Sequence, residues 1–187
     1  YGFASEDSDY DLRGIHRLPL DDVLGLNPKP ATVDTTSIVD GLEMDMVTHD
    51  VKKFFAMLLK NNGYVLEQLY SPIVISTSPE HEELKSIGSD CVTRHHAYHY
   101  MGFATSQWNM FKKQDAPRIK PLLYTYRVLL TGMHLMRTGL VEANLAVLNA
   151  EAQLSFVDEL ICMKREGAEK EELPSPDLAF HQRQFDE

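Results

Sequence analysis

Apolar and polar residues alternate with a period of two near the start of the chain, which predicts a β-strand. The segment reads Tyr-Asp-Leu-Arg-Gly-Ile from residue 10 to residue 15. In a strand, Asp9 and Asp11 share one face, while Tyr10 and Leu12 point to the other. The pattern therefore places two carboxylates side by side on one strand.

A second alternating segment lies at residues 42–47, where Glu43 and Asp45 oppose three apolar side chains. Residues 37–41 precede it and end in Asp-Gly, a dipeptide typical of tight β-hairpin turns. We therefore expect a hairpin whose second strand carries acids on one face. Between the two alternating segments, residues 18–36 contain closely spaced prolines, which predict a long loop without regular structure.

Farther along, the spacing of apolar residues changes to that of α-helices. It predicts a helix over residues 51–61 with a polar N-terminal cap, and a short helix over residues 65–70. Residues 73–76 read as another short strand. From residue 79 the pattern is almost entirely helical, with a long helix from about residue 90 to residue 113. Helices alone are expected in this second half.

The helix expected over residues 118–138 has an apolar core face and a second continuous stripe. This stripe holds two permanent cations and no carboxylate, so it is either a solvated helix face or the lining of a phosphate site. Gly139 ends the helix, another is expected over 150–165, and the acidic tail at 166–187 is expected to pack loosely. The stripe consists of Lys120, Tyr124, Arg127, Thr131 and His134.

Composition narrows the possible classes of protein. The 187 residues have the apolar and charged content of an ordinary globular protein, and the net charge of −10 argues against non-specific coating of nucleic acids, although not against a local basic groove. No apolar run approaches the roughly 20 residues that span a bilayer, and no signal peptide is recognisable. Cys91 and Cys162 are the only cysteines, which disfavours a disulfide framework or a zinc cluster and indicates a reducing cytoplasm.

The paired acids are the main candidates for chemistry. Asp9 and Asp11 on one strand face repel each other unless a cation lies between them, and carboxylate oxygens suit Mg²⁺. Asp45 on a second strand would add a third ligand. The alternatives are a polar turn that leads into a strand, for Asp9 and Asp11, and a solvated edge strand, for Asp45.

These segments resemble a known superfamily. Tyr-Gly-Phe-Ala at residues 1–4 and Ser-Asp-Tyr-Asp-Leu-Arg-Gly at residues 8–14 are similar to the core of the DNA polymerase β-like nucleotidyltransferases. That superfamily carries Asp-x-Asp on one strand, matched by Asp9 and Asp11. It carries a later acid on a neighbouring strand, matched by Asp45 and less well by Glu43.

A narrower resemblance is to a bacterial and phage branch of predicted nucleotidyltransferases, some of them named for an RNA repair pathway. It is carried by the same motifs together with Asp-Met-Val at residues 45–47 and the segment at residues 62–72. The similarity is specific over about residues 1–75 and weaker over residues 120–127. The superfamily's Gly-Ser element is expected just before Tyr1.

The resemblance implies an α+β fold. We expect a small mixed sheet with helices over residues 1–78, the nucleotidyltransferase core, and a helical domain with an acidic tail over residues 79–187. The cleft between the two domains is expected to hold the site.

The resemblance also implies a reaction, the two-metal transfer of a nucleoside monophosphate from a nucleoside triphosphate such as ATP to a hydroxyl acceptor. Mg²⁺ or Mn²⁺ is the expected cofactor, and an RNA end is one implied acceptor; no membrane is involved. Asp9, Asp11 and Asp45 are the expected catalytic residues and metal ligands. The expected contacts to the triphosphate come from Lys120, Tyr124 and Arg127.

Other functions remain open at this stage. Small relatives that transfer nucleotides to proteins provide one alternative, and a catalytically silent module that binds nucleotide or nucleic acid is another. Arg127 and His134 also have the loose spacing of the HEPN ribonuclease motif, although the helix stripe already accounts for them. His95, His96 and His99 suggest either a transition-metal site or a solvated, acceptor-facing helix surface, and the surface is favoured because no acid stands beside them.

Overall fold

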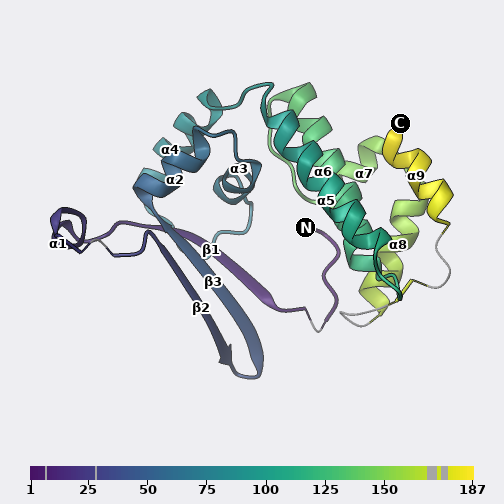
Figure 1. The fold of residues 1–187 in the computed structure, drawn as a ribbon, viewed down its shortest axis with the longest axis horizontal. Helices are drawn as coiled ribbons and strands as arrows, with labels where there is room; N and C mark the ends of the chain where they lie inside the picture. Colours follow the sequence, from purple (N-terminus) through teal and green to yellow (C-terminus); the bar gives the residue numbers. More distant parts are fainter. Residues whose placement is uncertain (7, 28, 168–171, 174–176) are drawn as a thin grey trace. The chain divides into compact units, whose positions relative to one another are not determined.

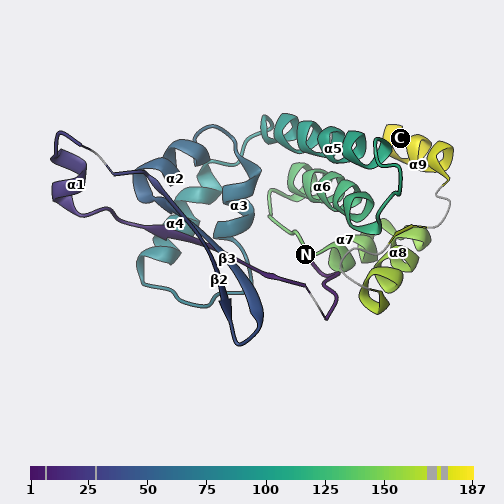
Figure 2. The same ribbon diagram turned by 60° about the horizontal axis from the view of Figure 1, so that its bottom comes forward.

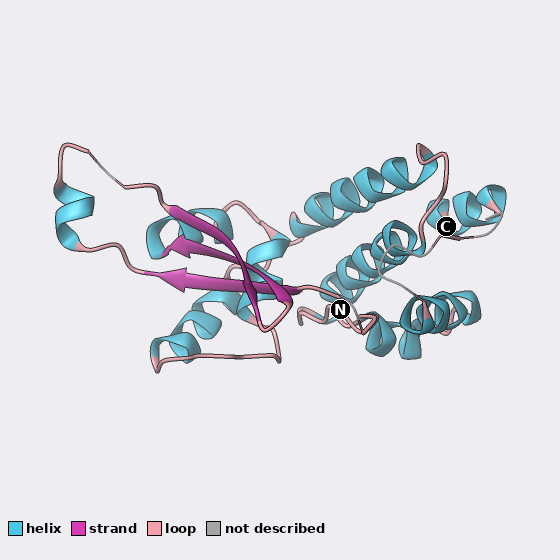
Figure 3. Cartoon of the chain, turned by 90° about the horizontal axis from the view of Figure 1, so that it is seen from below, coloured by secondary structure: helices cyan, strands magenta, loops and turns pink. Residues whose placement is uncertain are grey.

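The computed structural model describes residues 1–6, 8–27, 29–167, 172–173 and 177–187. It confirms the α+β class, with a three-stranded mixed sheet and many helices (Figures 1 and 3). The chain forms two compact units, which we call the sheet unit, Asp9–Val92, and the helical unit, Tyr1–Ser8 with Thr93–Glu187. The domain boundary expected near residue 78 stays a prediction, because packing units and domains need not coincide.

The sheet has the strand order β1-β3-β2. β1 (Tyr10–His16) is parallel to the central strand β3 (Leu42–Asp50), and β2 (Thr32–Val39) is antiparallel to β3. The hairpin turn between β2 and β3 has φ of 51° at Asp40 and 82° at Gly41. Positive φ at both central residues is what a two-residue hairpin turn requires, so the predicted hairpin is confirmed.

The prediction of a structureless loop over residues 18–36 is wrong in two places. A one-turn helix, α1 (Leu20–Leu24), forms there, and β2 begins at Thr32 rather than at residue 37. β2 is longer because β3 continues to Asp50 and offers a partner for the β-branched residues that follow Pro30.

Two capped helices follow the sheet. α2 (Val51–Leu58) begins where β3 ends, and the Asp50 carboxylate accepts a hydrogen bond from the Lys52 amide, 3.0 Å away. α3 (Gly63–Leu69) is capped by the Asn62 side chain, and α4 (Glu80–Asp90) packs against α3. The buried apolar side chains of α2 and α3 are Phe54, Leu58, Val65, Leu66 and Leu69.

The expected strand at residues 73–76 is absent, since that part of the described chain forms no strand. Ile73 and Ile75 are 76% and 80% exposed. An extended segment becomes a strand only where a sheet edge can pair with its backbone. Local alternation alone therefore gave a wrong prediction here.

The helical unit is centred on two long helices that pack side by side (Figure 2). α5 (His96–Lys112) begins later than expected, because Asp90 ends α4 instead of capping α5. α6 (Ile119–Thr138) ends at Gly139, whose φ of 75° is the left-handed conformation typical of a glycine C-cap, as predicted.

The helix expected over residues 150–165 is in fact two helices, α7 (Leu145–Ala152) and α8 (Ser155–Glu166). Gln153 between them has φ of 55°, which no α-helix accommodates. α9 (Leu178–Asp186) packs on the unit through buried His181, so the expectation of a loose tail is wrong for residues 177–187. Leu173 of the same tail is buried in the core of the unit, so the expectation is wrong there too, whereas residues 168–171 and 174–176 lie outside the described residues.

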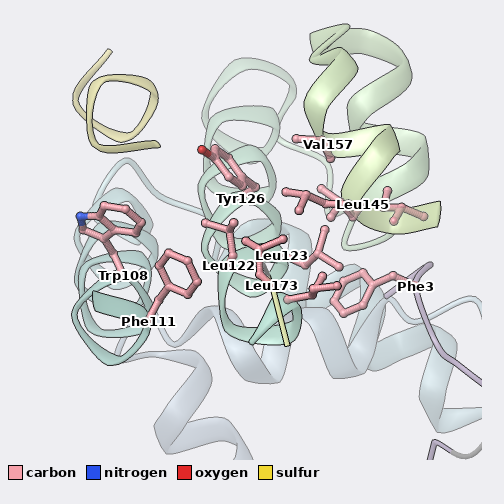
Figure 4. Packing of buried hydrophobic residues seen from close by; sticks show 12 residues of the cluster. Phe3, Trp108, Phe111, Leu122, Leu123, Tyr126, Leu145, Val157 and Leu173 are labelled. Atoms are coloured by element: carbon pink, nitrogen blue, oxygen red, sulfur yellow. The ribbon is translucent and has the colours of Figure 1, made fainter. Parts of the chain in front are cut away.

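The apolar core of the helical unit joins residues that are far apart in the sequence (Figure 4). Trp108 and Phe111 of α5 turn toward Leu122 and Tyr126 of α6. Phe3, close to the start of the chain, belongs to the same cluster. The segment that precedes the paired acids is thus built into the helical unit.

Candidate active site

The parallel pairing of β1 with β3 sets Asp11 directly opposite Asp45. Paired residues of neighbouring strands project to the same face of a sheet, so the two carboxylates share a face. Asp9 lies two residues before Asp11, just ahead of β1, and is exposed. The register thus places the acids from two distant segments on neighbouring positions of the sheet.

Arg13 links the two strands at this point. One guanidinium nitrogen donates to the Asp11 carboxylate at 2.6 Å, and the other donates to the main-chain carbonyl of Asp45 at 3.0 Å. The Arg13 side chain is 27% exposed and that of Asp11 is 56% exposed, so the ion pair lies at the protein surface. Sequence reasoning overlooked Arg13, although its position two residues after Asp11 puts both on one strand face.

Asp45 differs from Asp11 in its surroundings. Its carboxylate atom Oδ1 is buried and has no hydrogen-bond partner among the described residues. A buried carboxylate oxygen without a donor is unfavourable, because it has lost water and gained nothing in return. Such an atom is a place where a cation would be stabilising.

Tyr64 of α3 stands close to Arg13. Burial raises the pKa of the Tyr64 phenol, and the positive charge of Arg13 opposes part of that rise. Tyr64 is therefore a neutral hydroxyl beside the Asp11–Arg13 ion pair at physiological pH. It brings α3 into the surroundings of the acids.

The fit of a metal ion to these residues rests on the donor set. Carboxylate oxygens are the ligands that Mg²⁺ prefers, and the unpartnered Oδ1 of Asp45 is one of them. Within the described parts of the chain, no three His, Cys, Asp or Glu side chains are gathered as a ready-made metal site. The guanidinium of Arg13 is the cation that Asp11 contacts in this structure.

The stripe on α6 is not a solvated helix face. Arg127 is 1% exposed and Thr131 is fully buried, while Lys120, Tyr124 and His134 are partly buried. The Arg127 guanidinium carbon lies 4.1 Å from the centre of the Tyr1 ring and 5.4 Å from that of Tyr124. The stripe therefore packs against the start of the chain.

Other contacts also anchor the first residues to the helical unit. Lys164 of α8 is buried, and its ammonium group donates to the Ser5 hydroxyl at 2.7 Å. Arg165 donates to the Gly2 carbonyl at 2.6 Å. The sequence pattern gave no sign of these contacts, because they join residues more than 150 positions apart.

The remaining sequence candidates have separate structural roles. His134 faces Glu151, 3.3 Å away, whereas Arg127 contacts Tyr1, so the structure offers no joint site for the HEPN-like pair within the described residues. His96 is buried with Nδ1 next to Thr93, and His95 stacks on Tyr98. His96 thus has a structural position in the interior, and His95 lies on the surface of α5.

Acids paired across two strands of a small mixed sheet, followed by a helical unit, are the features expected of a polymerase β-like protein. The chain belongs to the RNA repair pathway DNA polymerase beta family, whose model matches residues 1–187. This match confirms the resemblance inferred from the Asp-x-Asp motif.

An uncharacterized protein of Methanocaldococcus jannaschii is 28% identical over 141 residues. The alignment covers 74% of this chain and 57% of that relative, so the chain spans little more than half of the relative's length. No solved structure matches the chain. Among the described residues, no helix is long and apolar enough to cross a membrane.

Proposed function

We propose that the protein is a metal-dependent nucleotidyltransferase that moves a nucleoside monophosphate from a nucleoside triphosphate to a hydroxyl acceptor. The observation that carries the proposal is the parallel register that sets Asp11 opposite Asp45, whose Oδ1 is buried with no hydrogen-bond partner among the described residues. The family name points to an RNA end as the acceptor.

Asp9, Asp11 and Asp45 are the residues that would hold Mg²⁺ or Mn²⁺. When bound, the divalent ion lowers the pKa of the acceptor hydroxyl and offsets charge on the triphosphate. Arg13 holds Asp11 in place by its 2.6 Å hydrogen bond and joins β1 to β3 through the Asp45 carbonyl. Its positive charge also reduces the repulsion among the acids.

Lys120, Tyr124 and Arg127 are the proposed contacts of the triphosphate. Lys120 is partly buried, whereas Arg127 is almost fully buried. Arg127 is buried beneath Tyr1, so its contact with a phosphate would require the Tyr1 ring to move. We therefore expect Lys120 to contribute more than Arg127 to triphosphate binding.

One observation favours a second candidate, a catalytically silent nucleotide-binding module. Arg13 is paired with Asp11, and the described acids are not gathered into a set of three. Such a module would bind a nucleoside triphosphate through the same cations and transfer nothing.

The deciding experiment offers labelled nucleoside triphosphates with Mg²⁺ to RNA, DNA and protein acceptors, using the full-length protein. We expect transfer to RNA, and its loss in Asp11→Asn. Asp34→Asn is the matched control, because Asp34 lies on the same sheet face but pairs with Val47 rather than with an acid. Triphosphate binding without transfer to any acceptor would establish the silent module, and transfer to protein alone would establish the other alternative.

Lys120→Ala should weaken triphosphate binding by roughly 1.5–3 kcal/mol, the usual loss for a hydrogen bond to a charged group. Titration calorimetry with a non-hydrolysable triphosphate measures this change. Lys52→Ala, which removes an exposed lysine of α2, should have little effect. If Lys120→Ala and Lys52→Ala bind the triphosphate with equal affinity, Lys120 does not contact it.

A further inference from the structure

Positive charge is concentrated in the helical hairpin formed by α5 and α6. Residues 91–141 contain seven lysines and arginines and a single carboxylate, Asp115, although the whole chain has a net charge of −10. A basic segment in an acidic protein marks a surface that meets polyanions. A polyanion can bind only the solvent-exposed part of this hairpin.

The solvent face of α5 is continuous and carries no acid. The buried face of this helix packs on the core through aromatic and small side chains, Tyr100, Ala104, Trp108 and Phe111 among them. The opposite positions, three or four residues apart, are all exposed, and they form one face along the helix. These positions, with the C-cap lysine at their end, are His95, Tyr98, Gly102, Thr105, Asn109 and Lys113.

Two rings are presented on this face near the start of α5. Tyr98 is 78% exposed, so its ring contributes little to the core. The His95 ring lies 6.1 Å from it at an interplanar angle of 19°. Exposed, roughly parallel aromatic rings are the platform on which unpaired bases stack.

Gly102 lies one turn after Tyr98, and nothing in the fold requires a glycine there. In the described parts of the chain, no atom lies within 4 Å of where a Cβ atom at this position would be. At Gly132 of α6, by contrast, a Cβ would come within 2.7 Å of the Tyr100 side chain. An exposed glycine inside a helix costs about 1 kcal/mol relative to alanine, and it leaves a flat area where a ligand can approach the backbone closely.

We propose that the solvent face of α5 binds single-stranded RNA. A base stacks on Tyr98, its sugar lies over Gly102, and the phosphates meet Arg94 and Lys113, which are both exposed. Single strands are preferred because the faces of paired bases are covered in a duplex. The proposal deepens the proposed function, since it rests on RNA being the acceptor, and it names the residues that hold the acceptor strand.

The test measures the anisotropy of a fluorescent, unstructured RNA of about 12 nucleotides, within the known range of single-strand site sizes. The full chain is used without nucleoside triphosphate or Mg²⁺. Tyr98→Ala should weaken binding by about 5- to 150-fold, the range for loss of one stacked base. Lys113→Ala should weaken binding and lower the slope of log K against log salt by about one, whereas Lys60→Ala, an exposed lysine of the sheet unit, should change neither.

Gly102→Gln separates binding from folding. Glutamine is a better helix former than glycine, and a Cβ atom here would meet no described atom within 4 Å, so the melting temperature should rise while RNA binding weakens. A duplex RNA of the same length should bind more weakly than the single strand. Unchanged binding in Tyr98→Ala or Gly102→Gln, or equal binding of duplex and single strand, would overturn the proposal.

The same assay on Asp11→Asn keeps this inference apart from the proposed activity. RNA binding that persists in Asp11→Asn and depends on Tyr98 supports the α5 surface whether or not the protein transfers nucleotides. Transfer to RNA that survives Tyr98→Ala at unchanged RNA affinity would support the enzyme and reject the α5 surface.

Discussion

Asp11 and Asp45 face each other across two strands, yet their carboxylates are in different electrostatic situations. Asp11 is mostly exposed and accepts a hydrogen bond from Arg13. Asp45 has one oxygen buried without a partner among the described residues, so its negative charge is less well compensated. Removal of charge at Asp45 should therefore affect both stability and cation binding.

Asp45→Asn is expected to abolish stabilisation of the protein by Mg²⁺. A ligand that binds only the folded state raises its stability, by about 2.7 kcal/mol at 100 times the dissociation constant. Thermal unfolding with and without Mg²⁺ should show a shift for the wild type and none for Asp45→Asn, while the metal-free variant melts at or above the wild-type temperature. Asp34→Asn should keep the shift; the same shift in Asp45→Asn would exclude Asp45 as a ligand.

Helices α5 and α6 approach each other closely at one glycine. A Cβ at Gly132 would lie 2.7 Å from the Cβ of Tyr100, which is buried in the contact. Small residues at a helix crossing let the backbones come together, and a larger side chain forces them apart. Gly132 thus allows α5 and α6 to pack closely, whereas Gly102 lies in the exposed surface of α5.

Gly132→Ala should destabilise the helical unit by about 1–3 kcal/mol, the usual cost of overpacking. The fluorescence of Trp108, the only tryptophan, reports unfolding of this unit in urea. Gly102→Ala is the control, since the same chemical change in open space should stabilise the unit by up to about 1 kcal/mol. Equal changes in stability for both substitutions would show that Tyr100 moves to accommodate the added methyl group without loss of stability.

Over the whole molecule, the helical unit depends on contacts between distant parts of the sequence. α9 is held through His181, whose Nδ1 lies 2.7 Å from the Tyr126 hydroxyl, and through Gln182, which accepts a hydrogen bond from the Trp108 indole. Burial lowers the pKa of His181, and the negative charge of Asp177 opposes part of that shift. Burial also lowers the pKa values of His96 and His99.

These lowered pKa values predict a loss of stability in mild acid. Well above pH 6.5 the three histidines are neutral in both the folded and the unfolded state. As the pH falls through 6.5, the unfolded chain binds protons more readily than the folded unit does, so unfolding becomes more favourable. Each histidine can then remove up to about 1.4 kcal/mol per pH unit. Urea midpoints followed by Trp108 fluorescence should fall between about pH 7 and 5.5, and His181→Gln should reduce the slope; an unchanged slope would show that His181 stays accessible to protons.

The sequence alone determined the features that depend on neighbours a few residues apart. The hairpin turn at Asp40-Gly41, the end of α6 at Gly139 and the cap of α2 follow from the conformational preferences of those residues. The period of two also placed Asp11 on the first strand and Asp45 on the second, whereas Asp9 lies just ahead of β1. Local rules suffice where a backbone conformation or a strand face is set by adjacent residues.

Only the tertiary structure decided the features that require distant partners. The segment at residues 73–76 forms no strand, whereas α9 is held by hydrogen bonds to Tyr126 and Trp108. The cationic stripe on α6 reads equally well as a solvated face, but its Arg127 is buried against the Tyr1 ring, which comes from the other end of the sequence. The alternative of a solvated edge strand for Asp45 does not hold, because β3 lies between β1 and β2 and the Asp45 Oδ1 is buried. Burial and pairing depend on which segments the folded chain brings together.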